Sequence, residues 1–369
     1  MNNGFIMIRQ RLLSLCLASA ASCLSSTCAF GQAVGAHGDD FLYRVMAGDT
    51  LGELATRYTS GWSNWTTLQS LNHVQDQARL PIGQVLKIPF ALIPELPSAA
   101  DVSYIAGQAA LDGQPLRLSS PVAEGQTVST EADGFVTLKL ADGSVLSIPA
   151  SSTMAVKRLR VFKGTGLIDV KVDVDKGALE SQVAPKHEGV GRFEVRTPVS
   201  ITGVRGTRFR VHFSPTQGAR SEVVQGVAGV EASHSADVML KAKQGMAVDS
   251  SGASLGVRDL LPAPLLPKPK DGGGSMTIEP VAGASGYLVR VAEDPDGTKM
   301  VSSRLFPTNQ IDYAAPGPGT YYLLVRAVDD VGLGGLDARQ EFAGKSVLQG
   351  YGGAPVLSGY GQPILVSDY

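Results

Sequence analysis

Few residues of this chain have the types and spacing that catalysis requires. Its five histidines lie far apart and lack the spacing of metal ligands. Gly252–Gly256 fits the G-x-S-x-G pattern of serine hydrolases around Ser254, but that motif needs a helix directly after it. Leu260, Pro262 and Pro264 follow instead, and the prolines prevent a helix. We therefore predict no catalytic residue, no metal site and no cofactor, and a protein that is not an enzyme.

Residues 41–92 predict a strand, two helices and a second strand. The first strand runs from Leu42 to Val45, and Asp49 or Thr50 can cap the helix that follows. The first helix has apolar residues at helical spacing that face inward: Leu51, Leu54, Ala55 and Tyr58. The second helix is marked by Trp65, Leu68 and Leu71 and stops at Asn72. A Pro-Ile-Gly turn leads into the last strand, which contains Val85 and Ile88. Such a unit is small but able to fold if it is well packed.

This segment resembles a LysM domain through three pieces in the same order: YRVMAGDTLGELATRY, LQSLN and LPIGQVLKIP. The resemblance implies a small α+β (βααβ) module that binds N-acetylglucosamine-containing glycans such as peptidoglycan. It places the ligand in a groove between two loops, formed by Gly48, Asp49, Thr50, Leu51, Leu80, Pro81, Ile82 and Gly83. Backbone groups there would hydrogen-bond acetamido groups, and apolar side chains would pack on sugar faces.

Each of these residues also has a purely structural explanation. Asp49 and Thr50 suit any helix start, and residues 81–83 suit any turn. Two tryptophans lie in or beside the connection between the helices. We expect Trp65 in the core, whereas Trp62 either stacks on a sugar or fills the core.

Residues 104–249 predict an all-β domain. Apolar and polar residues alternate over residues 136–140 and again at Leu146 and Ile148, and Asp142-Gly143 between them predicts a hairpin. The region resembles the FecR-type extracytoplasmic domain through GQTVSTEADGFVTLKLADGSVLSIPASSTMAV, FEVRTPVSITGVRGTRFRVHF and VVQGVAGVEA. Signalling members of that family need a membrane helix and a cytosolic tail, which we do not find here. The resemblance therefore implies an interaction or scaffold module.

Several arginines gather in and near the GVRGTRF segment: Arg192, Arg196, Arg205, Arg208 and Arg210. One interpretation is an anion site. The other is that they project from a strand face into solvent, while nearby glycines allow a tight bend. We expect the second arrangement.

A Pro- and Gly-rich linker, LLPAPLLPKPKDGGGS, spans residues 260–275, and few contacts are expected to cross it. Residues 276–342 resemble a fibronectin type III-like β-sandwich through PVAGASGYLVRVAEDPDG and GTYYLLVRAVDDVGLGG. In the second piece, Tyr322, Leu324 and Arg326 share one strand face. Residues 343–369 are expected to form a flexible Gly- and Tyr-rich tail. The predicted fold class is mainly β and multi-domain.

Residues 1–31 have the features of a signal peptide. Arg9 and Arg11 precede a short apolar run, and we expect cleavage after Gly31. All three cysteines lie in this leader: Cys16, Cys23 and Cys28. The mature chain would therefore contain no disulfide, and lipidation of a leader cysteine stays an alternative.

The formal net charge of −2 argues against nucleic acid or anionic lipid as the main partner. No segment after the leader is apolar for long enough to span a bilayer. We predict a protein of the periplasm or cell envelope that binds peptidoglycan through residues 41–92 and presents its β modules as an interaction scaffold. The alternative is an envelope sensor or assembly factor that acts with an outer-membrane or other envelope protein through the FecR-like domain.

Overall fold

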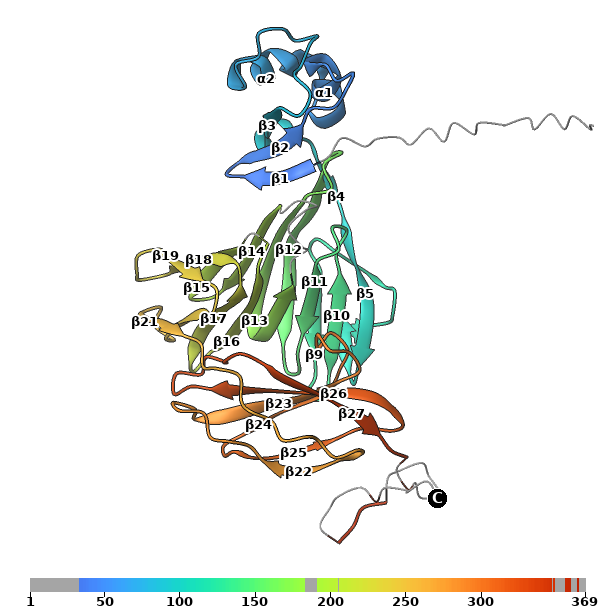
Figure 1. The fold of residues 1–369 in the computed structure, drawn as a ribbon, viewed down its shortest axis with the longest axis vertical. Coiled ribbons are helices and arrows are strands. Elements are labelled where there is room, and N and C mark those ends of the chain that lie inside the picture. The colour runs from blue at the N-terminus through green and yellow to red at the C-terminus, as the bar shows by residue number, and fades with distance from the viewer. Residues whose placement is uncertain are drawn as a thin grey trace, which may run out of the picture. The chain divides into compact units, whose positions relative to one another are not determined.

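The computed structural model describes residues 33–182, 191–204, 206–346, 348, 356–359 and 364 (Figure 1). Strands dominate this part of the chain, and its helical elements all lie between Leu51 and Leu92. The predicted fold class, mainly β with a small α+β segment, is confirmed. The predicted leader, its cysteines and Arg205 lie outside the described residues. Among the residues described, no helix is long and apolar enough to cross a membrane.

The first module, residues 33–93, is the predicted βααβ unit with one strand added. Its elements are β1 (Ala33–His37), β2 (Asp40–Arg44), α1 (Leu51–Tyr58), η1 (Trp62–Asn64), α2 (Trp65–Leu71), β3 (Val85–Pro89) and η2 (Phe90–Leu92). The three strands form an antiparallel sheet in the order β1-β2-β3. The Thr50 hydroxyl accepts a hydrogen bond from the Glu53 N–H and so caps α1, as predicted. All four apolar residues predicted to face inward on α1 are buried.

The core of the first module contains two side chains from outside it. Phe162 and Leu167 lie at either side of the turn between β12 (Thr153–Phe162) and β13 (Ile168–Gln182), and both are fully buried in this core. The Phe162 ring stacks on Phe90, with 4.4 Å between the ring centroids. The first module and the strands that follow it therefore share one hydrophobic core.

Polar contacts in the same turn reinforce this junction. The Lys163 ammonium donates to the carbonyl oxygens of Thr56 and Thr59 at 3.2 and 3.3 Å, where α1 ends. A cation is favourable there because unpaired carbonyls give a helix C-terminus a partial negative charge. Gly164 follows with a φ of +73°, and a Cβ at this position would lie 3.4 Å from the Tyr58 ring. A glycine at position 164 therefore accommodates both the positive φ and the close contact with the Tyr58 ring.

The central domain contains two packed sheets that share β13. Its other strands are β4 (Glu95–Pro97), β5 (Ala99–Ala106), β6 (Ala109–Leu111), β7 (Gln114–Pro115), β8 (Pro121–Ala123), β9 (Thr127–Thr130), β10 (Phe135–Lys139), β11 (Val145–Ile148), β14 (Arg192–Thr197), β15 (Ser200–Val204), β16 (Arg208–Ser214), β17 (Gly218–Gln225), β18 (Val227–Ala232), β19 (Val238–Lys241), β20 (Gln244–Val248) and β21 (Ser254–Asp259). The first half of β13 pairs with β12 and β14, and its second half pairs with β11 and β16. These strands begin before residue 104 and end after residue 249, so the domain is wider than predicted.

Two local features of the central domain follow directly from its sequence. The Asp142-Gly143 hairpin forms as predicted, with Val136 opposite Ile148 and Leu138 opposite Leu146. At Gly177, β13 passes from one sheet to the other with a φ of +83°. A Cβ there would lie 2.5 Å from the backbone of Ser152, so the crossing requires a glycine.

The C-terminal sandwich contains β22 (Gly273–Thr277), β23 (Gly286–Ala292), β24 (Met300–Phe306), β25 (Gln310–Ala314), β26 (Gly319–Val328) and β27 (Ala338–Gly344). A four-stranded sheet, β24-β23-β26-β27, and the β22–β25 pair enclose a separate core. On β26, Leu323, Val325 and Ala327 enter that core. Tyr322 and Leu324 pack instead with Phe135 of the central domain. The predicted division of β26 into two faces is confirmed.

The segment predicted as an open linker is packed at both ends. Leu260 is buried, and the Leu336 N–H donates to the Leu261 carbonyl at 2.9 Å. β22 already begins at Gly273, inside the predicted linker, and β27 ends at Gly344, inside the predicted tail. The expectation that few contacts connect the central domain to the C-terminal sandwich is wrong, because paired charges and a small apolar cluster join them. The Pro- and Gly-rich composition of residues 260–275 predicted a segment with little regular structure, but it did not indicate which residues pack against that segment.

Candidate functional site

The two predicted ligand loops lie side by side in the first module. The Gly83 N–H donates to the Val45 carbonyl at 2.8 Å, and the Leu51 N–H donates to the Gln77 carbonyl at 3.0 Å. These bonds tie the loop after β2 to the loop before β3. Gly48 and Gly83 have φ values of +90° and +86°, which favour glycine, so these two positions carry the turns of the paired loops.

Asp49 points into the module rather than toward solvent. Its side chain is only 7% exposed, and one carboxylate oxygen accepts from the Tyr43 hydroxyl and from the Met46 N–H, both at 2.7 Å. The Arg57 guanidinium lies 3.8 Å from the other oxygen. Burial, followed by the hydrogen bond to Asp49, raises the pKa of Tyr43. The Asp49 side chain therefore holds the loop in shape, and only its backbone is placed to contact a ligand.

The remaining predicted site residues divide into buried and exposed ones. Leu51 is fully buried and Leu80 nearly so, which leaves their side chains in the core. The Thr50 hydroxyl is occupied by the cap of α1. In contrast, Gly48 and Pro81 are exposed, and the Ile82 side chain is 72% exposed. Of the predicted apolar contacts, Ile82 and Pro81 are the ones open to solvent.

Comparison with known proteins identifies this module. Residues 43–89 match the LysM domain. Residues 126–229 match the FecR protein family, so two of the three resemblances found in the sequence, LysM and FecR, are confirmed over these ranges. LysM and FecR domains are binding or regulatory modules rather than catalytic ones. The first module is called the LysM module from here on.

Individual relatives cover only parts of this chain. An 86-residue segment is 34% identical to the N-acetylmuramoyl-L-alanine amidase XlyB of Bacillus subtilis (strain 168), covering 23% of this chain and 24% of the amidase. The chain thus spans about a quarter of that relative. Two crystal structures of a protein described as an anti-sigma factor of Parabacteroides distasonis align over 36% of this chain and 59% of theirs, at 18% and 19% identity and a TM-score of 0.30. That structural likeness is too remote to carry an argument.

Trp62 lies against Gly52 in the first turn of α1, the helix that follows the loop after β2. Its side chain is 61% exposed, so it does not fill the core. A Cβ on Gly52 would lie 2.6 Å from the Trp62 indole nitrogen, which shows that the ring rests on this glycine. Trp65 packs partly against the LysM core, and the two indole rings are 5.8 Å apart. The LysM module therefore holds an exposed aromatic ring that is supported by Gly52.

Gly52 is the residue of this site that the sequence argument missed. A glycine within an amphipathic helix lowers helix stability relative to alanine by about 1 kcal/mol. Such a glycine often marks a close approach by another group. That signal was present between Leu51 and Leu54, and the approaching group is Trp62.

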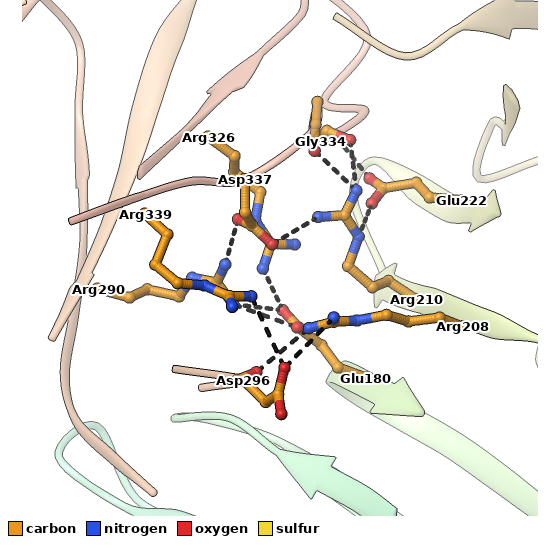
Figure 2. A network of polar contacts seen from close by, with 11 residues as sticks. Glu180, Arg208, Arg210, Glu222, Arg290, Asp296, Arg326, Gly334, Asp337 and Arg339 are labelled. Atoms are coloured by element: carbon orange, nitrogen blue, oxygen red, sulfur yellow. Dashed lines mark hydrogen bonds and ion pairs between the residues drawn. The ribbon is translucent and has the colours of Figure 1, made fainter. Parts of the chain in front are cut away.

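The arginines of the FecR-like segment do not all face solvent as predicted. Arg210 is 6% exposed, and its guanidinium donates to the carbonyls of Gly334 and Gly335 at 2.8 and 2.9 Å (Figure 2). Its Nε lies 2.6 Å from a Glu222 carboxylate oxygen. Burial is the leading effect on the Arg210 pKa and lowers it. The prediction fails here because the C-terminal sandwich covers this strand face.

Proposed function

We propose that this protein is secreted to the cell envelope and binds the glycan strands of peptidoglycan through its LysM module. The LysM match over residues 43–89 supports glycan binding. The proposal places N-acetylglucosamine units against the paired loops, with backbone groups of Gly48, Asp49, Thr50 and Gly83 as hydrogen-bonding partners. Pro81 and Ile82 are exposed and available for the apolar faces of the sugars.

Trp62 extends this proposed site. An exposed indole that rests on Gly52 keeps one free face, and aromatic rings commonly present such faces to apolar surfaces. A glycan that follows the loop from Gly48 to Leu51 would reach this face next. Because one small groove buries little area, we expect a weak affinity for a single module, roughly micromolar to millimolar.

The rest of the chain is proposed to act as a scaffold in the envelope. Cleavage after Gly31, a mature chain free of cysteine and a periplasmic location belong to this proposal, as does the fibronectin type III-like character of the C-terminal sandwich. The FecR match over residues 126–229 supports a second candidate function, a sensor or assembly factor that binds another envelope protein. Both candidates share the glycan-binding step and are not enzymatic.

Binding to purified peptidoglycan sacculi tests the glycan site. Ile82→Asp places a charge at an exposed apolar position, and Trp62→Ala removes the ring. Each should lower the affinity about fivefold or more, since about 1 kcal/mol of contact energy corresponds to that factor. Trp62→Tyr should retain part of the binding. Leu118→Asp is the matched control. Leu118 is 63% exposed, close to the 61% of Trp62, but it lies in the central domain.

Two other changes to the LysM module would give ambiguous binding results. Gly83→Val is unsuitable because Gly83 has a positive φ, so a loss of binding would be confounded with backbone strain. A chain that lacks the LysM module would expose Phe162 and Leu167, which invites nonspecific adhesion. If Ile82→Asp and Trp62→Ala both bind sacculi as tightly as the unaltered protein, the proposed site is wrong.

A further inference from the structure

A cavity of about 520 Å³ lies between the central domain and the C-terminal sandwich. One wall is the outer face of β13 and β16, and the other is formed by β23, β24 and β26. Ligand sites for small organic molecules commonly have volumes of about 300–1,000 Å³ and occur between domains. The cavity is distant in sequence from the LysM loops, so it is independent of the proposed glycan site.

The charged side chains that line this cavity leave a positive excess. Four are cationic and two are carboxylates: Lys176, Arg210, Arg290, Arg326, Glu180 and Glu222. Asp337 does not line the cavity but is bonded to Arg290 and Arg326, which reduces the excess from two charges to one (Figure 2). The remaining excess charge is that of Lys176, which is exposed at the edge of the cavity, and it favours an anion over a neutral or cationic molecule.

Two guanidinium groups that line the cavity also have N–H groups without acceptors. The Nε of Arg290 and the Nη1 of Arg210 are buried and have no hydrogen-bond partner among the described residues. A carboxylate oxygen of Asp337 lies 3.9 Å from that Nη1, beyond hydrogen-bond distance. A buried donor left unpaired is unfavourable, so a small shift of either side chain toward an acceptor in the cavity would be stabilising.

The other part of the lining is apolar. Leu288 on β23 and Met300 on β24 contribute hydrocarbon surface on one side, and Phe135 of β10 contributes it on the other. We propose that this cavity binds a small organic anion, with a carboxylate near Arg210 and Arg290 and an apolar body between Leu288, Met300 and Phe135. Lys176 and Ser303 are exposed, so the cavity opens to solvent beside them.

Ser303 offers a way to close the cavity without touching the charges. It pairs with Arg290 across β23 and β24 and shares its face, whereas the neighbouring Ser302 pairs with Val291, which enters the core of the C-terminal sandwich. Both serines are exposed. Ser303→Trp should therefore fill the mouth of the cavity, and Ser302→Trp is a control of equal size on the opposite face.

Isothermal titration of the full chain with three probes tests the proposal. The probes are 4-phenylbutyrate, its neutral analogue 4-phenylbutanol and its cationic analogue 4-phenylbutylamine. We expect the carboxylate to bind about tenfold more tightly than the alcohol, a factor that one charge-assisted hydrogen bond can supply. Ser303→Trp should lose this binding and Ser302→Trp should keep it, while Lys176→Gln should weaken it severalfold.

Three results would overturn the proposal. The first is the absence of binding by 4-phenylbutyrate at millimolar concentration. The second is equal affinity for the carboxylate and the alcohol, which would show that the cavity does not select anions. The third is unchanged binding by Ser303→Trp with circular dichroism like that of the unaltered chain, which would place the probe elsewhere.

Discussion

The LysM module and the C-terminal sandwich are attached to the central domain in opposite ways. At the LysM junction, Phe162 and Leu167 enter a core that already contains Phe90, and the contact is mainly apolar. At the C-terminal junction, Arg290 and Arg326 meet Glu180. The second junction also has a small apolar cluster, of which Phe135 and Met300 line the cavity.

This difference separates two physical ways of holding domains together. Burial of two large apolar side chains stabilises a junction with little dependence on pH or salt. Buried ion pairs contribute less net stability, because desolvation of the charges offsets much of their attraction. Their loss is nevertheless costly, since removal of one partner leaves a buried charge unpaired. We therefore expect the LysM junction to govern cooperative unfolding, and the C-terminal junction to be specific but sensitive to single substitutions.

The largest effect is expected for Phe162→Ala. Truncation of a fully buried phenylalanine lowers the free energy of unfolding by about 3–5 kcal/mol. The two tryptophans of the chain, Trp62 and Trp65, both lie in the LysM module, so their fluorescence reports on that module alone. In urea, fluorescence and circular dichroism should change together in the unaltered protein and separate in Phe162→Ala.

The control for this substitution is Phe342→Ala. Phe342 is equally buried, but in the core of the C-terminal sandwich. Its truncation should move the midpoint of the tryptophan fluorescence change less than Phe162→Ala does. A fluorescence midpoint that moves as far in Phe342→Ala as in Phe162→Ala would show that the two junctions are not distinct.

A somewhat smaller effect is expected for Arg326→Met. Arg326 is 3% exposed and bonds to Glu180 at 2.7 Å and to Asp337 at 2.9 Å. Its removal leaves two carboxylates short of a partner and should cost about 3 kcal/mol. Arg304→Met, at an exposed position of the same sandwich, should change stability by about 0.5–1 kcal/mol.

The rate of proteolysis within residues 260–275 measures how far Arg326→Met and Arg304→Met loosen the C-terminal sandwich. Arg326→Met should be cut there faster than the unaltered chain, and Arg304→Met should not. Equal rates for all three proteins would mean that the ion pairs do not hold the sandwich in place.

The smallest effect is a pH dependence carried by Glu180. Burial raises its pKa, but Arg326 and Arg290 outweigh burial and lower it to about 2. Because the pKa is lower in the folded state than in the unfolded chain, this carboxylate stabilises the fold above about pH 4.5. That contribution is lost as pH falls from about 4.5 toward 2.

Glu180→Gln isolates this contribution. The difference in unfolding free energy between the unaltered protein and Glu180→Gln should be about 1–2 kcal/mol above pH 5 and shrink as the pH approaches 2. Urea titrations monitored by circular dichroism measure it. A difference that stays constant down to pH 2 would contradict the ionised, paired state of Glu180, and Phe162→Ala should show no comparable pH dependence.

Local sequence patterns predicted individual helices and strands, but not which parts of the chain pack against them. The helical spacing from Leu51 to Tyr58 and the Asp142-Gly143 hairpin were both predicted correctly, because each depends on residues close in sequence. The paired loops of the LysM module follow from the family resemblance. The inward position of Asp49 was not predicted, because a capping residue and a ligand contact share the same sequence signature.

The amino-acid sequence by itself determined the LysM and FecR segments and, within strands of alternating pattern, the face on which each side chain lies. The alternation of Phe209, Val211 and Phe213 placed Arg210 on the outer face of β16. Only the tertiary structure decided that this outer face is covered by residues more than one hundred positions away. Strand periodicity records which side chains share a face, but burial of that face depends on distant segments that no local pattern contains.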